Sequence, residues 1–236
     1  MTIPTLQLKL KQRLNKLDSQ DYDNIEKWQI VEAFNKAQVE WCRRNLHGNN
    51  LYKEGDEQSK RRVDDLQVLL VEQALTGVSN DDYFQSINFP SKNNYLEYKR
   101  VSCQAVTECC PEPRKMTVYL AEEANVDIIL RDSLKNPSFE WSETFCTLIN
   151  GQVRIYKNEE FDIVNPVLTY YRKPVYIQIS NSIDPYTGNV STVDIEPEFK
   201  DDLVEIMIDE TAAIIAGDIG NYNTMQVSQQ TGERNN

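Results

Sequence analysis

The end of the chain, residues 197–236, constrains the fold more than any other stretch, because it combines an amphipathic segment with an amide-rich tail. Pro197 suits a first helical position, where its missing N–H costs nothing, and Gly217 is a typical helix stop. The pattern therefore predicts a helix over residues 197–217. Its apolar residues recur at spacings of three, four and seven and form one stripe: Phe199, Leu203, Ile206, Met207, Ala213 and Ile214.

The opposite face of this predicted helix is acidic. It carries Asp201, Asp202, Glu205, Asp209 and Glu210 against the single Lys200. Beyond the helix, residues 218–236 are rich in Asn and Gln and hold four spaced apolar residues: Ile219, Tyr222, Met225 and Val227. Such a segment buries too little apolar surface to offset its ordering entropy alone. It is therefore either a disordered end or an extended arm that orders on a partner through those four residues.

The charge and length of the chain narrow the classes of function. A chain of 236 residues can bury a sizeable core, about 70 per cent of its unfolded surface. The net charge of −12 argues against a protein that holds nucleic acid by neutralising phosphates, whereas an acidic wall suits a channel through which DNA must slide. The longest unbroken apolar run, residues 212–216, is far short of a membrane span, so we expect no membrane association.

The five cysteines are odd in number and lack a C-x-x-C spacing, which indicates free thiols in a reducing compartment. Neighbouring Cys109 and Cys110 leave a metal or redox site open. His47 is the single histidine, however, so a zinc set would need distant ligands. Ordinary buried or loop thiols are the simpler interpretation, and we expect neither a metal nor a cofactor.

The first 77 residues are predicted to form a small helical bundle. Leucines at helical spacing, separated by basic residues, predict a helix over residues 5–17 with a basic outer face. A third helix is expected over residues 59–74, followed by Gly77 as its stop. Its inward residues would be Val63, Leu66, Leu70 and Ala74.

Between these two lies the second predicted helix. Its apolar stripe runs from Ile30 to Trp41 at helical spacing and predicts one buried face. Trp28 and Val31 fall outside that stripe, which predicts that they point toward a neighbouring surface.

Residues 78–196 are predicted to be β-rich. The clearest signal is a hairpin of residues 144–149 and 152–156 around Asn150-Gly151, a pair that favours a type I′ turn. A second hairpin is expected from residues 175–179 and 190–195. Further strands are predicted over residues 116–120 and 167–171 and around the alternating residues 101–106, while residues 122–134 fit either a helical turn or extended chain. The order of these segments indicates an α+β fold: an N-terminal helical bundle, an antiparallel β-hairpin region (78–196), and a long C-terminal amphipathic helix (197–217) that packs on the bundle and continues into an extended tail (218–236).

No catalytic constellation emerges from the sequence. A Cys–His pair would have to use His47, which sits at a predicted helix end. Adjacent carboxylates occur throughout the chain, and on an acidic surface they are usually solvated rather than catalytic. A glycine-rich phosphate loop is missing from the eight glycines. We therefore expect a protein that is not an enzyme.

Three stretches resemble the head-to-tail connector ring proteins of crAss-like bacteriophages: residues 24–38 (NIEKWQIVEAFNKAQ), residues 168–174 (LTYYRKP) and the end helix over 199–218. The layout is more distantly similar to the tail adaptors of other short-tailed phages. The resemblance implies a virion protein at the head–tail junction, assembled in the host cytoplasm. Such proteins form twelve-fold rings under the portal, pass genomic DNA through a central channel and contact further tail or ring proteins.

On this resemblance, the tail of the chain is a portal-docking arm whose contacts are Ile219, Tyr222, Met225 and Val227. The acidic residues expected to face the channel are Asp201, Asp202, Glu205 and Asp209. Two alternatives stay open at this point. One is a tail or capsid accessory structural protein, and the other is a virion-associated hydrolase that uses paired carboxylates.

Overall fold

The computed structural model describes residues 1–14, 25–47, 64–109 and 111–219, together with residues 226 and 230. Within them the chain is α+β, as predicted: N-terminal helices pack against a C-terminal helix, and eight strands form a curled mixed sheet, a half-barrel. The chain divides into two compact units, unit 1 (residues 1–68 and 174–236) and unit 2 (residues 69–173). The sequence-based segments change at residues 77 and 196, so both unit boundaries lie earlier in the chain.

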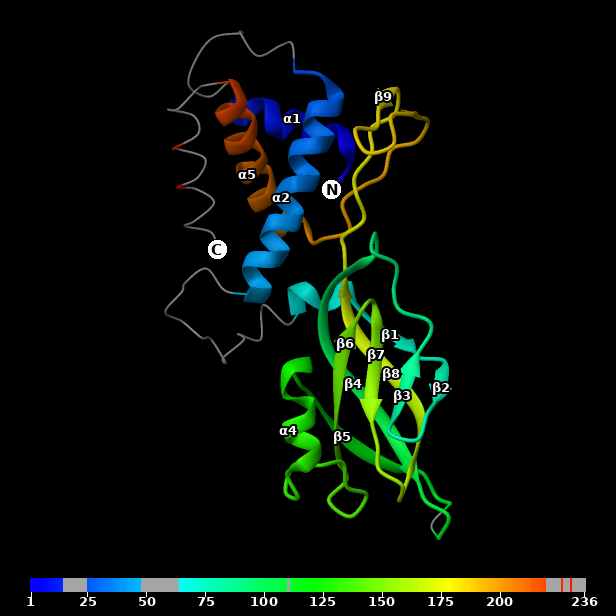
Figure 1. The fold of residues 1–236 in the computed structure, drawn as a ribbon. Helices are drawn as coiled ribbons and strands as arrows, with labels where there is room; N and C mark the ends of the chain where they lie inside the picture. The colour runs from blue at the N-terminus through cyan, green and yellow to red at the C-terminus, as the bar shows by residue number, and fades with distance from the viewer. Residues whose placement is uncertain (15–24, 48–63, 110, 220–225, 227–229, 231–236) are drawn as a thin grey trace. The chain divides into compact units, whose positions relative to one another are not determined.

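Among the described residues, unit 1 contains the long helices α1 (Ile3–Leu14), α2 (Lys27–His47) and α5 (Asp201–Ile219) (Figure 1). α5 packs against both α1 and α2. In α1 every third or fourth residue is buried, namely Ile3, Leu6, Leu10 and Leu14, as the helical spacing predicts. Residues 15–17 of that predicted helix lie outside the described residues. The predicted basic outer face is wrong for Lys9 and Arg13, because acidic residues of α5 lie opposite them and both side chains turn inward.

α2 buries more of its surface than the sequence predicts. The predicted stripe from Ile30 to Trp41 is buried, which confirms the helical spacing. Val31 is also buried, at 2% exposed, so the prediction that it points to a neighbouring surface is wrong. The reason is that α2 packs against β9 (Ser182–Ile183) as well as against α5. Trp28 stays partly exposed at 39%.

Two buried amides on α2 explain why the second predicted hairpin is shorter than expected. The backbone N–H of Ile177 donates to Asn35 Oδ1 at 2.9 Å, and Gln38 Nε2 donates to the carbonyl of Val175 at 3.2 Å. Residues 175–179 therefore bond to a helix instead of forming a strand. The hairpin reduces to two-residue strands, β9 with β10 (Val190–Ser191), and one bridge between residues 178 and 195.

α5 begins and ends later than predicted. Residues 197–200 precede the helix because they are held elsewhere: the Glu198 carboxylate accepts from the backbone N–H of Val175 at 2.9 Å. The Phe199 ring packs edge-on against Trp41, with ring centroids 5.6 Å apart. Gly217 does not stop the helix, because it does not adopt the left-handed conformation, and α5 continues to Ile219.

Unit 2 contains the curled sheet, whose order is β1-β8-β4-β5-β6-β7-β3-β2. Its strands are β1 (Leu70–Ala74), β2 (Gly77–Ser79), β3 (Tyr83–Ser86), β4 (Tyr95–Val106), β5 (Arg114–Leu120), β6 (Glu143–Ile149), β7 (Gln152–Tyr156) and β8 (Asp162–Arg172). β5 and β6 pair in parallel, and the other neighbours pair antiparallel. The core of the sheet is apolar: its members include Val101, Cys103, Ala105, Met116, Cys146, Val153, Ile155 and Leu168.

The sequence prediction is wrong for the third helix. Residues 64–66 are helical and are followed by the short 3-10 turn η1 (Gln67–Leu69), but residues 70–74 form β1. β1 pairs antiparallel with β8, from Leu70 opposite Tyr171 to Ala74 opposite Val167. Pairing with a strand distant in sequence overrides the local helical spacing. Residues 59–63 of the predicted helix lie outside the described residues.

The predicted hairpin at residues 144–156 is confirmed as β6 and β7. Asn150 has φ 48° and Gly151 has φ 69°, the two positive values that a type I′ turn requires. The strand predicted at residues 116–120 is confirmed as part of β5, and that at residues 167–171 as part of β8. The ambiguous residues 122–134 are helical in part, with the 3-10 turn η2 (Glu123–Asn125) and helix α4 (Val126–Arg131).

Candidate functional site

The candidate site is the helix α5 with the side chains that surround it in unit 1. Because α1 and α2 cover α5 from two directions, its buried surface is wider than the predicted stripe. Of the predicted stripe, all but the half-buried Ile214 are buried. Further buried residues of α5 are Val204, Ile208, Thr211, Ala212, Ile215 and Ala216. A helix with so wide an apolar surface is a core helix of its unit.

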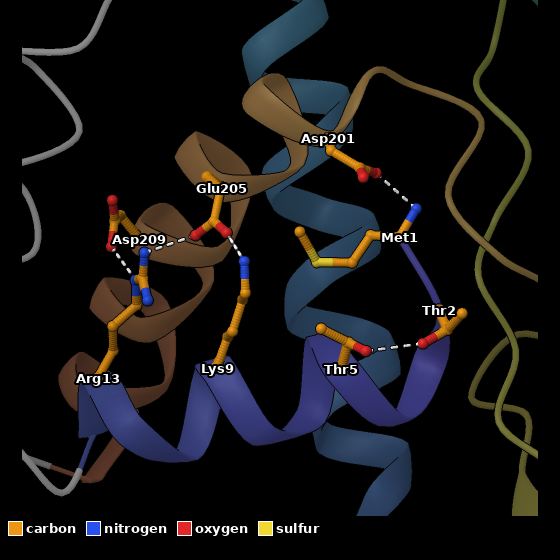
Figure 2. Close-up of polar contacts among 8 residues, drawn as sticks. All are labelled: Met1, Thr2, Thr5, Lys9, Arg13, Asp201, Glu205 and Asp209. Atoms are coloured by element: carbon orange, nitrogen blue, oxygen red, sulfur yellow. Dashed lines mark hydrogen bonds and ion pairs between the residues drawn. The ribbon is translucent and has the colours of Figure 1, made fainter.

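Two of the acidic candidates on α5 contact α1. Arg13 donates through Nη2 to Glu205 Oε2 at 2.7 Å and through Nε to Asp209, and Lys9 donates to the other oxygen of Glu205. Figure 2 shows the four side chains in one row between the helices. Asp209 is 7% exposed, so its carboxylate depends on Arg13 for charge compensation. Within unit 1 these two carboxylates hold α1 against α5.

The other two acidic candidates lie in the first turn of α5 and remain at the surface. The Asp201 side chain is 74% exposed, and its Oδ1 lies 2.6 Å from the amino group of Met1 (Figure 2). Asp202 is exposed. Carboxylates in a first turn are favoured by the positive end of the helix dipole. The four predicted candidates thus divide into two exposed residues, Asp201 and Asp202, and two residues that are paired with cations of α1, Glu205 and Asp209.

A third carboxylate of α5 and the lysine just before the helix are also paired within unit 1. Glu210 forms an ion pair with Arg44 of α2. Lys200 contacts Asp64 and, at 3.3 Å, Asp65. Hydrogen bonding to Asp64 raises the pKa of Lys200, with a smaller contribution from Asp65. Most carboxylates on the predicted acidic face of α5 therefore form ion pairs with cations of unit 1.

The sequence contains a signal for these partners that residue-by-residue interpretation misses. Lys9 and Arg13 are four residues apart, and so are Glu205 and Asp209. Residues four apart share one face of a helix, so two helices packed side by side can match such pairs in register. Each pair alone appears solvated, and only the packing of α1 on α5 brings them together.

The docking-arm candidates follow directly from α5. Ile219 is the last residue of the helix, whereas Tyr222, Met225 and Val227 lie outside the described residues. Near this end of α5 is a groove of about 350 Å³ between α2 and α5. Its lining includes Trp28, Ala33, Lys36, Ile214, Ile215 and Asp218. The arm thus begins beside a surface that exposes an indole ring.

The thiols of the described residues are mostly buried. Burial, and secondarily the charge of Glu198, raises the pKa of Cys42 to about 12, which keeps this thiol neutral. Cys109 is exposed, and Cys110 lies outside the described residues. Groups of three or more potential metal ligands do not occur in the part of the chain that the structure describes. A neutral, buried thiol packs as a small apolar group.

The sequence matches no protein-family model and no curated protein. Across the described ranges, every helix is too short or too polar to cross a membrane. Function is therefore inferred from the contacts of α5, from the surfaces of the two units and from the resemblance of residues 24–38, 168–174 and 199–218. The strongest support comes from the packing of α5 against α1 and α2, because the predicted arm follows this helix in the sequence.

Proposed function

We propose that the protein is a non-enzymatic structural protein of a virion, which forms a ring between the portal and the tail and lets genomic DNA pass. The observation that carries this proposal is the set of contacts that α5 makes with α1 and α2. The predicted arm follows α5 in the sequence. Ion pairs join α5 to α1 through Arg13 and to α2 through Arg44. The phage-connector resemblance of residues 24–38 and 199–218 gives the proposal its partners.

A rigid base matters for an arm that orders on contact. Ordering the arm costs conformational entropy, so its contacts must not also pay for fixing the helix that bears it. α5 meets this requirement, because Glu205, Asp209 and Glu210 are already paired with arginines of α1 and α2 and most of its apolar side chains are already buried. The apolar residues Tyr222, Met225 and Val227 would then supply contacts to a groove of the portal.

The division of the acidic residues refines the proposed channel wall. Glu205 and Asp209 bind α1, so their charge is directed into the subunit. Asp201 and Asp202 keep exposed side chains, and we assign the contact with the DNA channel to these two. Carboxylates there would repel phosphates and prevent the DNA from sticking as it slides.

The test uses the full chain and the purified portal ring of the same phage. In the arm variant, Tyr222, Met225 and Val227 are changed together to serine. In the matched control, Gln226, Gln229 and Gln230 are changed to serine, which leaves the apolar anchors in place. We expect the wild type and the control to co-sediment with the portal as rings of twelve copies. The arm variant should lose at least tenfold in affinity, because buried apolar anchors dominate such contacts.

Two measurements give that outcome a clear meaning. Thermal unfolding of the arm variant should match that of the wild type, because the substituted residues lie beyond α5. Electron microscopy of virions made without the protein should show heads that have lost their DNA. Filled heads would favour the accessory-protein alternative, and equal portal binding by the arm variant and the wild type would contradict the docking role.

A further inference from the structure

Unit 2 carries a groove that the proposed ring function does not use. It lies between α4 with its flanking loops and the strands β5 and β6, and its volume is about 390 Å³. Its walls are mainly apolar: Tyr119, Leu120, Ala121, Ile129, Leu134 and Phe145 line it. Figure 1 shows α4 beside these strands within unit 2. All of these residues belong to residues 69–173 and so to one compact unit.

The walls of the groove are exposed to an extent that folding alone does not explain. Leu134 is 89% exposed, Tyr119 is 53% and Leu120 is 51%. Exposed apolar side chains that gather around a hollow mark a site of protein contact. A site for a small molecule would enclose its ligand, whereas here the apolar walls continue out onto the surface. The groove therefore fits a chain segment that lies along it.

The floor of the groove is preformed. Phe145 is buried and stacks on Tyr156, with ring centroids 4.5 Å apart and planes 16° apart. With Val126 these rings form a small core of their own, against which Ala121 and Ile129 also pack. A floor fixed in this way needs no rearrangement to accept a ligand, which lowers the entropic cost of binding.

The charges at the rim indicate what kind of segment binds. Glu122 and Glu143 line the groove against the single Lys135, which itself lies 3.9 Å from Asp132. Glu143 accepts a hydrogen bond from the hydroxyl of Tyr119 at 3.1 Å, and an ionised carboxylate keeps further acceptor sites. The rim is thus acidic. A second copy of this chain is a poor source of such a segment, because its basic, leucine-rich helix α1 already buries Leu6, Leu10 and Leu14 within unit 1.

From these observations we infer that the groove between α4, β5 and β6 binds an apolar segment of a different protein, flanked by lysine or arginine residues. Apolar side chains of the segment would cover Leu120, Leu134 and Phe145, and its cations would meet Glu122 and Glu143. The groove and the arm lie in different units and use different residues. Failure of this inference therefore leaves the proposed portal docking untouched, and the reverse holds as well.

The test uses the full chain and a fluorescein-labelled peptide of leucine and alanine with two lysines at each end. A second peptide carries glutamates in place of the lysines. Leu134→Ser removes an exposed wall of the groove without changing charge, and Val78→Ser, at a position 57% exposed in unit 2, is the matched control. We expect fluorescence anisotropy to show at least tenfold weaker binding of the lysine peptide by Leu134→Ser. Val78→Ser should bind like the wild type.

Three further readouts separate the inference from its rivals. Glu122→Gln should weaken binding of the lysine peptide and reduce the difference in affinity between the lysine peptide and the glutamate peptide. Methyl resonances of Leu120 and Ile129 should shift when the lysine peptide is added to the wild type. The inference is overturned if the wild type does not bind the lysine peptide, or if Leu134→Ser binds it equally well, as simple charge adhesion would. It is also overturned if sedimentation shows self-association of the wild type that Leu134→Ser abolishes, because the occupant is then a second copy.

Discussion

Replacing Arg13 by methionine should destabilise unit 1 far more than replacing Lys9 by methionine. Both cations bind Glu205, but only Arg13 also binds Asp209. The Lys9 and Glu205 side chains are 34% and 31% exposed, which places their pair among partly solvated ones worth about 0.2–1 kcal/mol. Asp209 is 7% exposed, and removal of its partner leaves a buried carboxylate uncompensated, at a cost of about 3 kcal/mol.

The assay can isolate unit 1. Of the three tryptophans, Trp28 and Trp41 lie in unit 1 and Trp141 in unit 2, so a Trp141→Phe background makes the fluorescence report on unit 1 alone. Urea unfolding curves of each variant give the change in free energy of unfolding. The double variant Arg13→Met/Asp209→Leu should recover most of the free energy of unfolding that Arg13→Met loses, because an apolar pair of similar volume leaves no uncompensated buried carboxylate at position 209.

Equal losses of free energy of unfolding in Arg13→Met and Lys9→Met would contradict this prediction. So would losses from Arg13→Met and Asp209→Leu that simply add in the double variant. Additive losses would mean that the two side chains do not interact in solution. Raising the salt concentration provides a control. It should reduce the small effect of Lys9→Met and leave most of the Arg13→Met effect, since buried pairs are screened less than exposed ones.

Trp141 lies in unit 2 and should report the effects of two glycine substitutions in that unit. Gly77→Ala should lower the free energy of unfolding by about 2 kcal/mol or more, because a Cβ there would meet the carbonyl oxygen of Gln85 at 2.0 Å. Gly151→Ala should lower it by only about 1 kcal/mol, because a Cβ there would meet no atom within 4 Å and only the φ of +69° is unfavourable. Equal urea midpoints for the two variants would contradict this. Burial raises the pKa of each of three thiols from 9.0, to about 12 for Cys42 and Cys103 and to about 11 for Cys146. The folded protein therefore keeps its full stability below pH 9 and loses stability above it, because the thiols ionise first in the unfolded chain. At pH 10 each of the three thiols should lower the free energy of unfolding by about 1.4 kcal/mol relative to pH 8. A free energy of unfolding that rises over this interval would contradict the prediction.

Local chemistry explains which parts of the fold the sequence predicts well. The turn at Asn150-Gly151 needs two positive φ angles, and those residue types supply them without help from the rest of the chain. The helices α1 and α2 follow from spacing alone. β1 could not be predicted in this way, because its alternating exposure becomes meaningful only once β8 lies beside it. Pairing across such a sequence distance leaves no mark on residues 70–74 themselves.

The same limit applies to the candidate site. The sequence shows the carboxylates of α5, and the apolar stripe predicts correctly that the helix is buried on one face. It does not show which carboxylates are exposed, because that depends on the side chains that α1 and α2 bring opposite. Arg13 and Arg44 look like parts of solvated basic faces until the helices pack. The matched spacing of Lys9 and Arg13 with Glu205 and Asp209 becomes informative only when both helices are known to be neighbours.

The division of unit 1 between both ends of the chain has a consequence for its synthesis. Arg13 and Asp209 lie 196 residues apart, and all of unit 2 is made between them. At about 5–20 residues per second, α1 must wait roughly 10–40 s on the ribosome before α5 emerges to cover its leucines. Unit 2 is continuous and can fold during that delay. Until the last helix arrives the leucines of α1 lack the surface that covers them, so we expect chains truncated before α5 to aggregate more readily than the full chain.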